Sequence, residues 1–171
     1  MRYILENGNS HYNEQNGINI SKYSRWMNSI LRRSEEIGKS ELPICSIILD
    51  ERGRCIGRGV NRRNINKDPL GHAEIMALRQ ASLIKNDWRF NECIIISNLE
   101  PCTMCASALI LARMGKVVFG AYDKKRGGLG GSIDLSKHKS SHHKMEIIGG
   151  ILEDECSKIL QNWFKKLRTQ K

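Results

Sequence analysis

CIIISNLEPCTMCASALILARMGKVVFGA, at residues 93–121, is the stretch that decides the fold. Its opening run, Cys93 to Ser97, is apolar and rich in isoleucine, which is typical of a buried strand. Residues Cys102 to Met114 are apolar over a longer span and predict a helix, and Lys116 to Ala121 predict a second strand. A strand, a helix and another strand in succession indicate an α/β layered fold.

The segments on either side extend this alternation. Trp26, Ile30 and Ile37 form one apolar stripe, so a helix from Ser21 to about Gly38 should pack on the sheet. Other segments have the length and composition of single strands or helices. We expect strands at Ile44–Leu49, Cys55–Val60 and Glu146–Ile148, a turn at Glu51–Gly53, and helices at His72–Lys85 and Asp154–Arg168.

Two of the expected helices begin with residues that bind metals. The first begins His72-Ala73-Glu74, and the second follows Pro101 as Cys102-Thr103-Met104-Cys105. One imidazole and two thiolates make three zinc ligands, whereas a structural zinc site has four. Zinc with three protein ligands keeps a fourth position for water and lowers the pKa of that water to about 7. The pattern therefore predicts a catalytic zinc site on His72, Cys102 and Cys105.

Glu74 is predicted to lie beside the metal. Residues two apart do not face the same way on a helix, so His72 and Glu74 should not both be ligands. A carboxylate next to activated water can take a proton from it and pass that proton on, which is general acid and base catalysis. Cys102 and Cys105 fall in a first helical turn, where the helix dipole favours thiolates.

A closed structural zinc site is the alternative, because a C-x-x-C pair on its own is most often structural or redox-active. Cys93 or His142 would then supply a fourth ligand. Glu74 argues against this reading, since a closed site has no use for a neighbouring carboxylate. His138, His142 and His143 lie in a stretch rich in Lys and Ser, and we expect them on a surface loop.

The order H-x-E and then P-C-x-x-C is the signature of zinc-dependent nucleobase deaminases. From about Leu42 to the C-terminus the chain resembles one family among them, the bacterial tRNA-specific adenosine deaminases. The matching runs are Asn61-Arg62, Asp68-Pro69, residues 72–80, Leu99-Glu100-Pro101-Cys102, residues 117–120 with Asp123, Gly150-Ile151-Leu152 and Asp154-Glu155-Cys156. Cys45-Ser46 and Leu70-Gly71 depart from the usual family residues, and both could reshape the pocket wall slightly.

The resemblance implies a fold and an activity. The fold would be the three-layer α/β/α cytidine deaminase-like fold, with a central mixed sheet and helices on both faces. The activity would be zinc-dependent hydrolytic deamination of adenosine to inosine at the wobble position, position 34, of a tRNA anticodon loop. The enzyme would be a homodimer with one zinc ion per subunit. Glu74 would accept the proton of the water and then protonate N1 of adenine and the leaving ammonia.

The resemblance also implies four substrate-binding residues. Asn61 would hydrogen-bond the flipped adenine, the backbone N–H of Ala73 would face that base, and Asp123 would lie near the nucleotide entering the pocket. Phe164 would contact a flanking base of the loop. From residue type alone, Asn61 and Asp123 could be turn residues, and Phe164 could be a core residue like its neighbour Trp163, which we expect to be buried.

The charge of the chain suits a polyanionic partner. Lys and Arg number 28 against 18 Asp and Glu, which gives a formal net charge of +10. Such a surplus attracts nucleic acids, although many basic proteins bind none specifically. We expect a basic rim around the pocket. It would consist of Arg62, Arg63, Lys67, Lys124, Lys125 and Arg126.

The remaining sequence features indicate the cellular location and the need for cofactors. Besides the two cysteines of the zinc motif, Cys45, Cys55, Cys93 and Cys156 lie in apolar or strand-like runs, so buried free thiols in the reducing cytoplasm are expected. No apolar run suits a membrane span. Residues 127–131 are glycine-rich but lack the spacing of a dinucleotide loop, so we expect a flexible connector and no organic cofactor.

Residues 1–20 are mostly polar and predict a disordered N-terminal tail, and residues 21–171 predict a single zinc deaminase domain with a basic C-terminal helix. Two other functions stay open. The chain could deaminate a free base or nucleoside such as guanine or cytidine, because the zinc chemistry is shared. It could also be a noncatalytic deaminase-like subunit that binds RNA.

Overall fold

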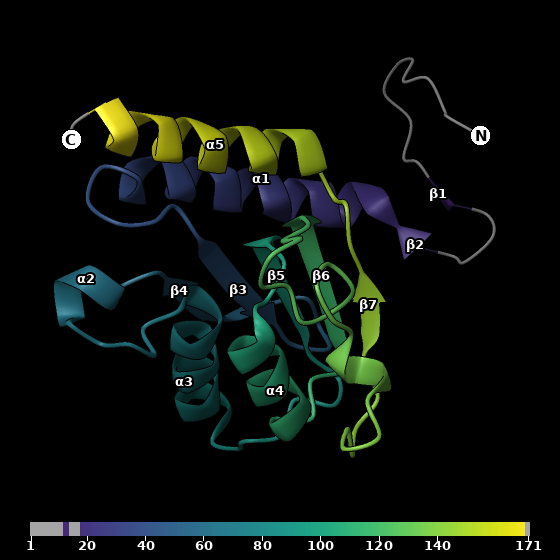
Figure 1. Ribbon diagram of the computed structural model, residues 1–171. Helices are drawn as coiled ribbons and strands as arrows, with labels where there is room; N and C mark the ends of the chain where they lie inside the picture. Colours follow the sequence, from purple (N-terminus) through teal and green to yellow (C-terminus); the bar gives the residue numbers. More distant parts are fainter. Residues whose placement is uncertain (1–11, 14–17, 170–171) are drawn as a thin grey trace.

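The computed structural model describes residues 12–13 and 18–169 of the chain. Helices and strands alternate along most of this length (Figure 1). In chain order the elements are β1 (Tyr12–Asn13), β2 (Ile18–Asn19), α1 (Ile20–Ile37), β3 (Cys45–Leu49), β4 (Cys55–Val60), α2 (Arg63–Asn66), α3 (Ala73–Lys85), β5 (Ile94–Leu99), α4 (Thr103–Leu111), β6 (Lys116–Ala121), the 3-10 turn η1 (Leu135–Lys137), β7 (Glu146–Ile148) and α5 (Glu153–Thr169).

Five of the strands form a central mixed sheet in the order β4-β3-β5-β6-β7. β3 pairs antiparallel with β4 and with β5, whereas β5 with β6 and β6 with β7 are parallel. The two parallel pairs require crossovers, which α4 and the long segment containing η1 provide. The mixed sheet that the resemblance implies is confirmed.

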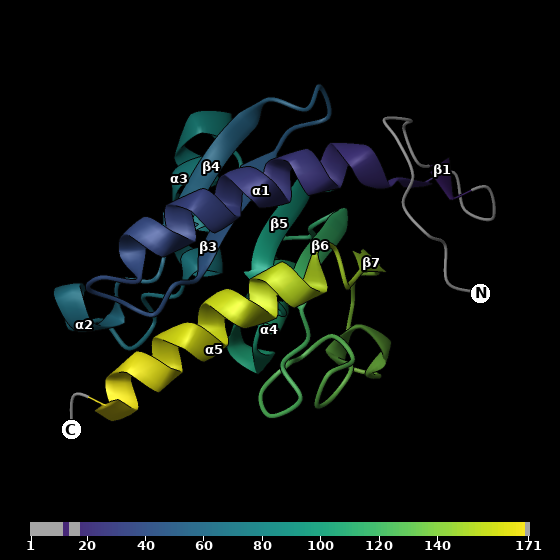
Figure 2. The ribbon, with the colours of Figure 1, turned by 90° about the horizontal axis from the view of Figure 1, so that it is seen from above.

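Helices cover both faces of the sheet, because alternate side chains of each strand point to opposite faces. Ile48, Ile95 and Val117 belong to the core beneath α3 and α4. Their neighbours Ile96 and Val118 belong to the core beneath α1 and α5. Figures 1 and 2 show α1 and α5 side by side across one face, with α3 and α4 on the other. The three-layer architecture is therefore confirmed.

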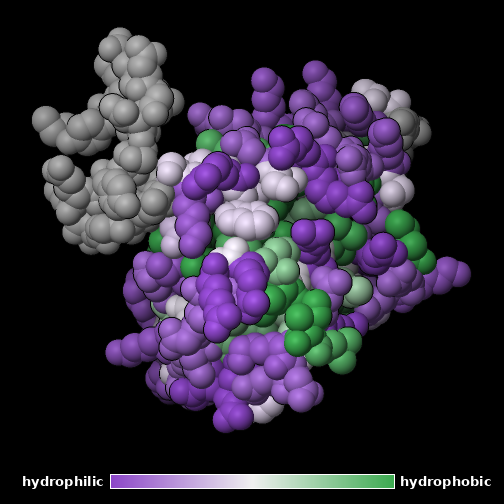
Figure 3. Space-filling view, turned by 180° about the vertical axis from the view of Figure 1, so that it is seen from behind, coloured by the Kyte–Doolittle hydropathy of each residue, from purple (hydrophilic) through white to green (hydrophobic). Residues whose placement is uncertain are grey.

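The face of the protein that lies behind the view of Figure 1 is mainly hydrophilic. Seen from behind, polar and charged side chains surround a smaller apolar area (Figure 3). None of the helices in the part of the chain that the structure describes is long and apolar enough to cross a membrane.

The N-terminal prediction is only partly covered by the described residues. Tyr12–Asn13 pairs with Ile18–Asn19 in a small antiparallel ladder, and α1 already begins at Ile20. Most of the predicted tail at residues 1–20 lies outside the described residues. The division into a tail and a domain stays a prediction.

The start of α3 is fixed by an unusually close approach to β4. A Cβ atom at Gly59 would lie 1.8 Å from the carbonyl oxygen of Ala73, and one at Gly57 would lie 2.5 Å from the carbonyl oxygen of Ala77. Only hydrogen on these two Cα atoms lets the helix lie so near the strand. Since His72 immediately precedes α3, this packing also places one of the predicted zinc ligands.

Gly59→Ala is therefore expected to destabilise the protein strongly. The added methyl group would push against the helix backbone, which cannot turn aside as a side chain can, and overpacking of this kind costs about 1–3 kcal/mol or more. Urea unfolding of the wild type and the variant measures this loss. Gly38→Ala is the matched control, because its Cβ would be 3.3 Å from its nearest neighbour, and a loss of stability as large as that of Gly59→Ala would contradict the packing argument.

Candidate metal centre and pocket

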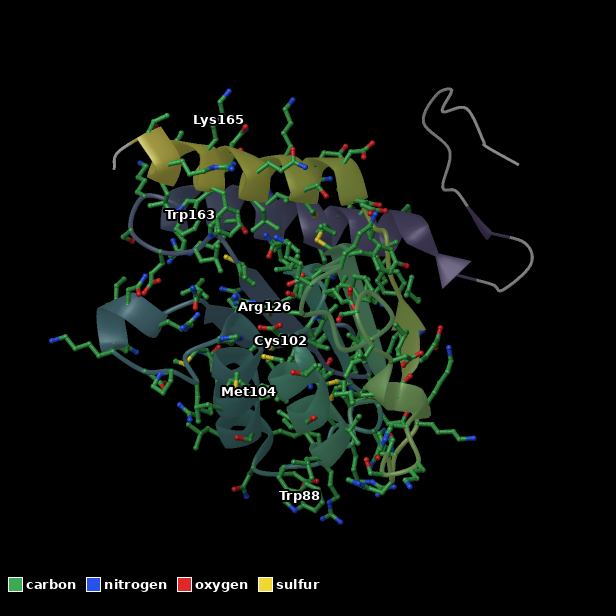
Figure 4. All side chains as sticks on the ribbon, viewed as in Figure 1. Trp88, Cys102, Met104, Arg126, Trp163 and Lys165 are labelled. Carbon is green, nitrogen blue, oxygen red and sulfur yellow. The ribbon has the colours of Figure 1, made fainter. Side chains whose placement is uncertain are left out.

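The predicted ligands lie at the starts of two neighbouring helices. His72 is the residue before α3 and Cys102 the residue before α4, and both have extended backbones that turn into the helix. Cys105 lies in the first turn of α4 and is fully buried. Figure 4 shows Cys102 between the two helix starts, with Arg126 next to it in the view and Trp163 farther away in the layer of α1 and α5.

The three side chains converge on one point. The Nδ1 atom of His72 is 3.6 Å from the Sγ atom of Cys102 and 3.5 Å from that of Cys105. All three possible ligand atoms lie within 4.8 Å of one another. Among the described residues, no other group of His, Cys, Asp and Glu gathers in this way, and neither Cys93 nor His142 belongs to it. Cys93 is buried in the core beneath α3 and α4, so it offers no fourth ligand.

The donor set fits a cation. Hydrogen bonds from Cys105 and His72 lower the pKa of Cys102 to about 4, whereas the hydrogen bond to Cys102 and burial raise the pKa of Cys105. The bond to Cys102 likewise raises the pKa of His72. The pKa of one sulfur is thus lowered, whereas that of the other sulfur and that of the imidazole are raised. A bound zinc ion would let both sulfurs be thiolates and leave the imidazole neutral, which are the forms that zinc binds.

Glu74 lies beside this cluster, inside the protein. It belongs to the first turn of α3 and is only 4% exposed. Its place in the first turn, two residues after His72, puts it next to the cluster. Burial raises the pKa of Glu74 to about 7, and a backbone hydrogen bond and the neighbouring Cys102, His72 and Cys105 have smaller effects. A carboxyl group that gains and loses a proton near neutral pH suits proton transfer.

Two segments flank the metal cluster, and we call them its walls. The first wall is the segment between β4 and α3. Asn61 follows β4, is buried, and donates its backbone N–H to the carbonyl oxygen of Ile44 at 3.0 Å. The next residue, Arg62, donates its backbone N–H to the carbonyl oxygen of Gly71 at 2.8 Å. This bond joins the chain just after Asn61 to the chain just before His72. Ala73 is fully buried, as its close packing against Gly59 requires.

The short helix α2 in this wall was not expected from the sequence. Its anchor is Glu41, a fully buried carboxylate in the loop after α1. Glu41 accepts hydrogen bonds from the Ile65 backbone N–H at 2.7 Å and from the Asn64 side-chain amide at 3.2 Å. These bonds join residues far apart in the sequence, so no local pattern could have indicated them.

The second wall is the loop at residues 123–131, on the Cys102 side of the cluster. The prediction of a flexible connector at residues 127–131 is wrong, because Gly127, Gly128 and Leu129 are buried. Gly127 pairs with Cys102 in an isolated β-bridge, and the Gly128 N–H donates to the carbonyl oxygen of Pro101 at 2.9 Å. The glycine-rich composition suggested flexibility, but hydrogen bonds to other parts of the chain hold these backbone groups in place.

Asp123 has a structural role in that loop. Its Oδ1 atom accepts hydrogen bonds from the backbone N–H groups of Lys125 at 2.9 Å and Arg126 at 3.0 Å. This is the turn residue that its type alone suggested. The side chain is half-buried, so one face of it is still accessible.

The structure does not bring Phe164 into the metal cluster. Phe164 is exposed on α5 and contacts the Trp163 ring edge to face, with ring centres 5.1 Å apart. Trp163 is half-buried, which differs from the expected full burial. It lines an open groove of about 610 Å³ between the C-terminal ends of α1 and α5.

The expected basic rim consists of exposed cations. Arg62, Arg63 and Lys67 lie in the first wall, and Lys124, Lys125 and Arg126 lie in the second wall. Among the described residues, none of these six forms an ion pair. His138 and His142 are exposed, as expected, whereas His143 is half-buried with its Nε2 atom 2.8 Å from the Met114 carbonyl oxygen.

Comparisons with known proteins agree with this geometry. The family model for the cytidine and deoxycytidylate deaminase zinc-binding region matches residues 20–121. The tRNA-specific adenosine deaminase of Haemophilus influenzae is 34% identical over 150 residues, 88% of this chain and 86% of that protein.

Two solved structures share the fold. One, from a study of A-to-I editing by tRNA:A34 deaminases at the wobble position of transfer RNA, has a TM-score of 0.76 and 31% identity, over 80% of this chain and 99% of that one. A guanine deaminase from Nitrosomonas europaea has a TM-score of 0.68 and 20% identity, over 82% of this chain and 83% of that one. At that identity the second likeness concerns the fold alone.

Proposed function

This chain belongs to the tRNA-specific adenosine deaminases, within the zinc-binding cytidine and deoxycytidylate deaminases, and we propose from that membership that it converts adenosine to inosine at the wobble position of a tRNA anticodon loop. The observation that carries the proposal is the convergence of His72, Cys102 and Cys105 beside the buried Glu74. The reaction is a hydrolysis: water adds to C6 of adenine, the bond from C6 to its amino nitrogen breaks, and ammonia leaves.

His72, Cys102 and Cys105 would hold one zinc ion per chain. When bound, zinc supplies Lewis-acid chemistry that lowers the pKa of water to about 7 and so makes a nucleophile available at neutral pH. The support for this assignment is the donor set itself, in which the pKa of one sulfur is lowered and that of the other is raised. The alternative of a closed structural site has no support, because neither Cys93 nor His142 joins the group among the described residues.

Glu74 would be the residue that moves protons. It would take one from the attacking water and pass it to N1 of adenine. It would then take the proton of the new hydroxyl group on C6 and give it to the amino group, which leaves as ammonia. Two observations support this role. The carboxyl group lies inside the protein next to the ligand cluster, and burial raises its pKa to about 7.

Four residues would bind the target nucleotide. Asn61 and Ala73 have the best support, because both are buried on the wall next to His72. Asp123 would act from the second wall, where it also shapes the turn at Lys125 and Arg126. Phe164 would contact a flanking base at the surface, and its exposed ring on α5 suits stacking.

The RNA backbone would be bound by the basic rim on the two walls. Six exposed cations without ion-pair partners in the described part of the chain are available for phosphates. A loop base is already unpaired, so its extrusion into the pocket costs little. Binding through several phosphates should weaken steeply as the salt concentration rises.

We also propose a homodimer in the cytoplasm. Leu83 and Ile84 on α3 and Leu111 at the end of α4 are exposed apolar residues that a second subunit could cover. All six cysteines are free, which suits a reducing compartment and the thiolate ligands. A monomeric mass in solution, measured by light scattering at micromolar concentration, would contradict the dimer.

Substrate choice tests the proposal against its rivals. The purified protein is expected to deaminate an anticodon stem-loop with adenine at the wobble position, and not the same stem-loop with cytosine there, free guanine or free cytidine. Conversion of a free base or nucleoside without conversion of the stem-loop would instead show a small-molecule deaminase. Tight stem-loop binding without any deamination would show a noncatalytic RNA-binding subunit.

A further inference from the structure

Glu100 is a buried charge that the proposed reaction does not use. It lies between the end of β5 and Pro101, two residues before Cys102, and is only 2% exposed. Among the described residues, no Lys, Arg or His side chain forms an ion pair with it. A buried carboxylate without a cation is costly unless hydrogen bonds compensate it, so its partners indicate its role.

The partners of Glu100 are backbone N–H groups of the second wall. Its Oε1 atom accepts hydrogen bonds from Leu129 and Gly131, and its Oε2 atom accepts one from Asp123, all at 2.9 Å. One carboxylate thus holds both ends of the loop at residues 123–131. Hydrogen bonds to a charged acceptor are stronger than neutral ones and together fix the loop firmly.

Two glycines make room for this carboxylate. A Cβ atom at Gly127 would lie 2.3 Å from the carboxyl carbon of Glu100, and one at Gly131 would lie 2.1 Å from its Oε2 atom. The glycine-rich composition of the loop therefore serves close approach to Glu100. It does not provide mobility.

The loop that Glu100 holds carries groups predicted to meet the substrate. Its first residue is Asp123, and the exposed cations Lys124, Lys125 and Arg126 follow in the turn. At Gly127 the loop pairs with Cys102. Through hydrogen bonds between its carboxylate and backbone N–H groups, Glu100 therefore connects the Cys102 end of the metal cluster to the exposed cations at residues 124–126.

We propose that Glu100 is a positioning residue, which sets the wall at residues 123–131 at the distance from Cys102 that the incoming nucleotide requires. The inference rests on the proposed function, since it concerns how that substrate is held. Glu100 touches neither the substrate nor the metal. It acts through Asp123 and the cationic turn.

Glu100→Gln tests this role. A glutamine has the same shape but offers one acceptor oxygen, so its NH₂ group would face at least one of the three N–H groups. We expect the KM for the stem-loop to rise about tenfold or more, as the loss of a charged hydrogen bond implies, with a smaller change in kcat and with unchanged zinc content. The amide hydrogens of Asp123, Leu129 and Gly131 should exchange faster, which is a readout independent of activity.

Asp50→Asn is the matched control. Asp50 is also buried and accepts two backbone hydrogen bonds, from Arg52 and Arg54, but it lies in the turn at the far end of the β3–β4 hairpin from Asn61 and also pairs with the Arg54 side chain. This variant should lose a similar amount of stability and keep the wild-type KM. Gly131→Ala would disturb the same contact through the loop, because the added methyl group would push against the Glu100 carboxylate, and it should raise KM as Glu100→Gln does. The double variant should be no worse than the more severe single variant.

The results of these experiments distinguish the positioning role of Glu100 from the proposed function. Faster exchange of the loop amides with a wild-type KM, or an equal rise of KM in Asp50→Asn, would overturn the positioning role and leave the proposed function intact. Unchanged exchange would overturn it as well. A wild-type protein that leaves the stem-loop adenine unchanged would overturn the proposed function, and the positioning of that substrate with it.

Discussion

Glu74→Gln is expected to lower kcat for stem-loop deamination by about 10² to 10⁴, the usual contribution of a positioned general acid and base. Glutamine keeps the size of the side chain but can neither take a proton from water nor return one to adenine. Because Glu74 is buried beside the ligands and is not itself one of the converging ligands, zinc content should stay at one ion per chain.

The measurement is inosine formed per minute at saturating stem-loop, together with zinc analysis of the same samples. Glu92→Gln is the control, because Glu92 is an exposed carboxylate just before β5. Equal rates in wild type and Glu74→Gln would remove Glu74 from the reaction. Loss of zinc in Glu74→Gln would show instead that the carboxylate holds the metal.

Cys105→Ser is expected to remove both zinc and activity. Cys105 is fully buried and lies 3.5 Å from the His72 imidazole, so no other sulfur can take its place. A serine hydroxyl ionises far less readily than a thiol and is a poor zinc ligand. Replacement of residues that merely orient zinc ligands already weakens binding by about 10- to 100-fold, so loss of a ligand should exceed that.

Zinc per chain and the rate of inosine formation are measured on protein purified without added metal. Cys55→Ser is the matched control, because Cys55 is a half-buried free thiol outside the ligand group. It should keep one zinc ion and full activity. Stoichiometric zinc in Cys105→Ser, with its loss in Cys93→Ser or His142→Ala, would support the closed structural site.

Much of the fold could be predicted because the decisive patterns are local. The segment Cys55–Val60, after the predicted turn, and the hydrophobic run at Lys116–Ala121 form strands with the predicted bounds. The second motif helix ends earlier than predicted, at Leu111, because the chain turns through a left-handed Arg113 before β6. Apolar composition continued past that point, so periodicity alone could not locate the end.

The convergence of His72, Cys102 and Cys105 could be predicted for a similar reason, since these residues lie at the starts of two helices within recognisable short motifs. The positions of the two walls could not be predicted from such local motifs. Glu41 and Glu100 hold backbone groups more than twenty residues away, and such pairings have no local signature. An acidic residue directly after an apolar strand, together with a later glycine-rich run, was the available hint at Glu100. The glycine-rich composition suggested a flexible backbone, whereas in the structure these glycines permit a close contact with the Glu100 carboxylate.

The most direct test of the account is the nucleoside composition of an anticodon stem-loop after incubation with the purified wild-type protein. The stem-loop carries adenine at the wobble position and at a second loop position. We expect inosine in place of the wobble adenosine, with the second adenosine unchanged. Adenosine retained at the wobble position by zinc-loaded protein, under conditions in which the stem-loop is bound, would contradict the proposed function.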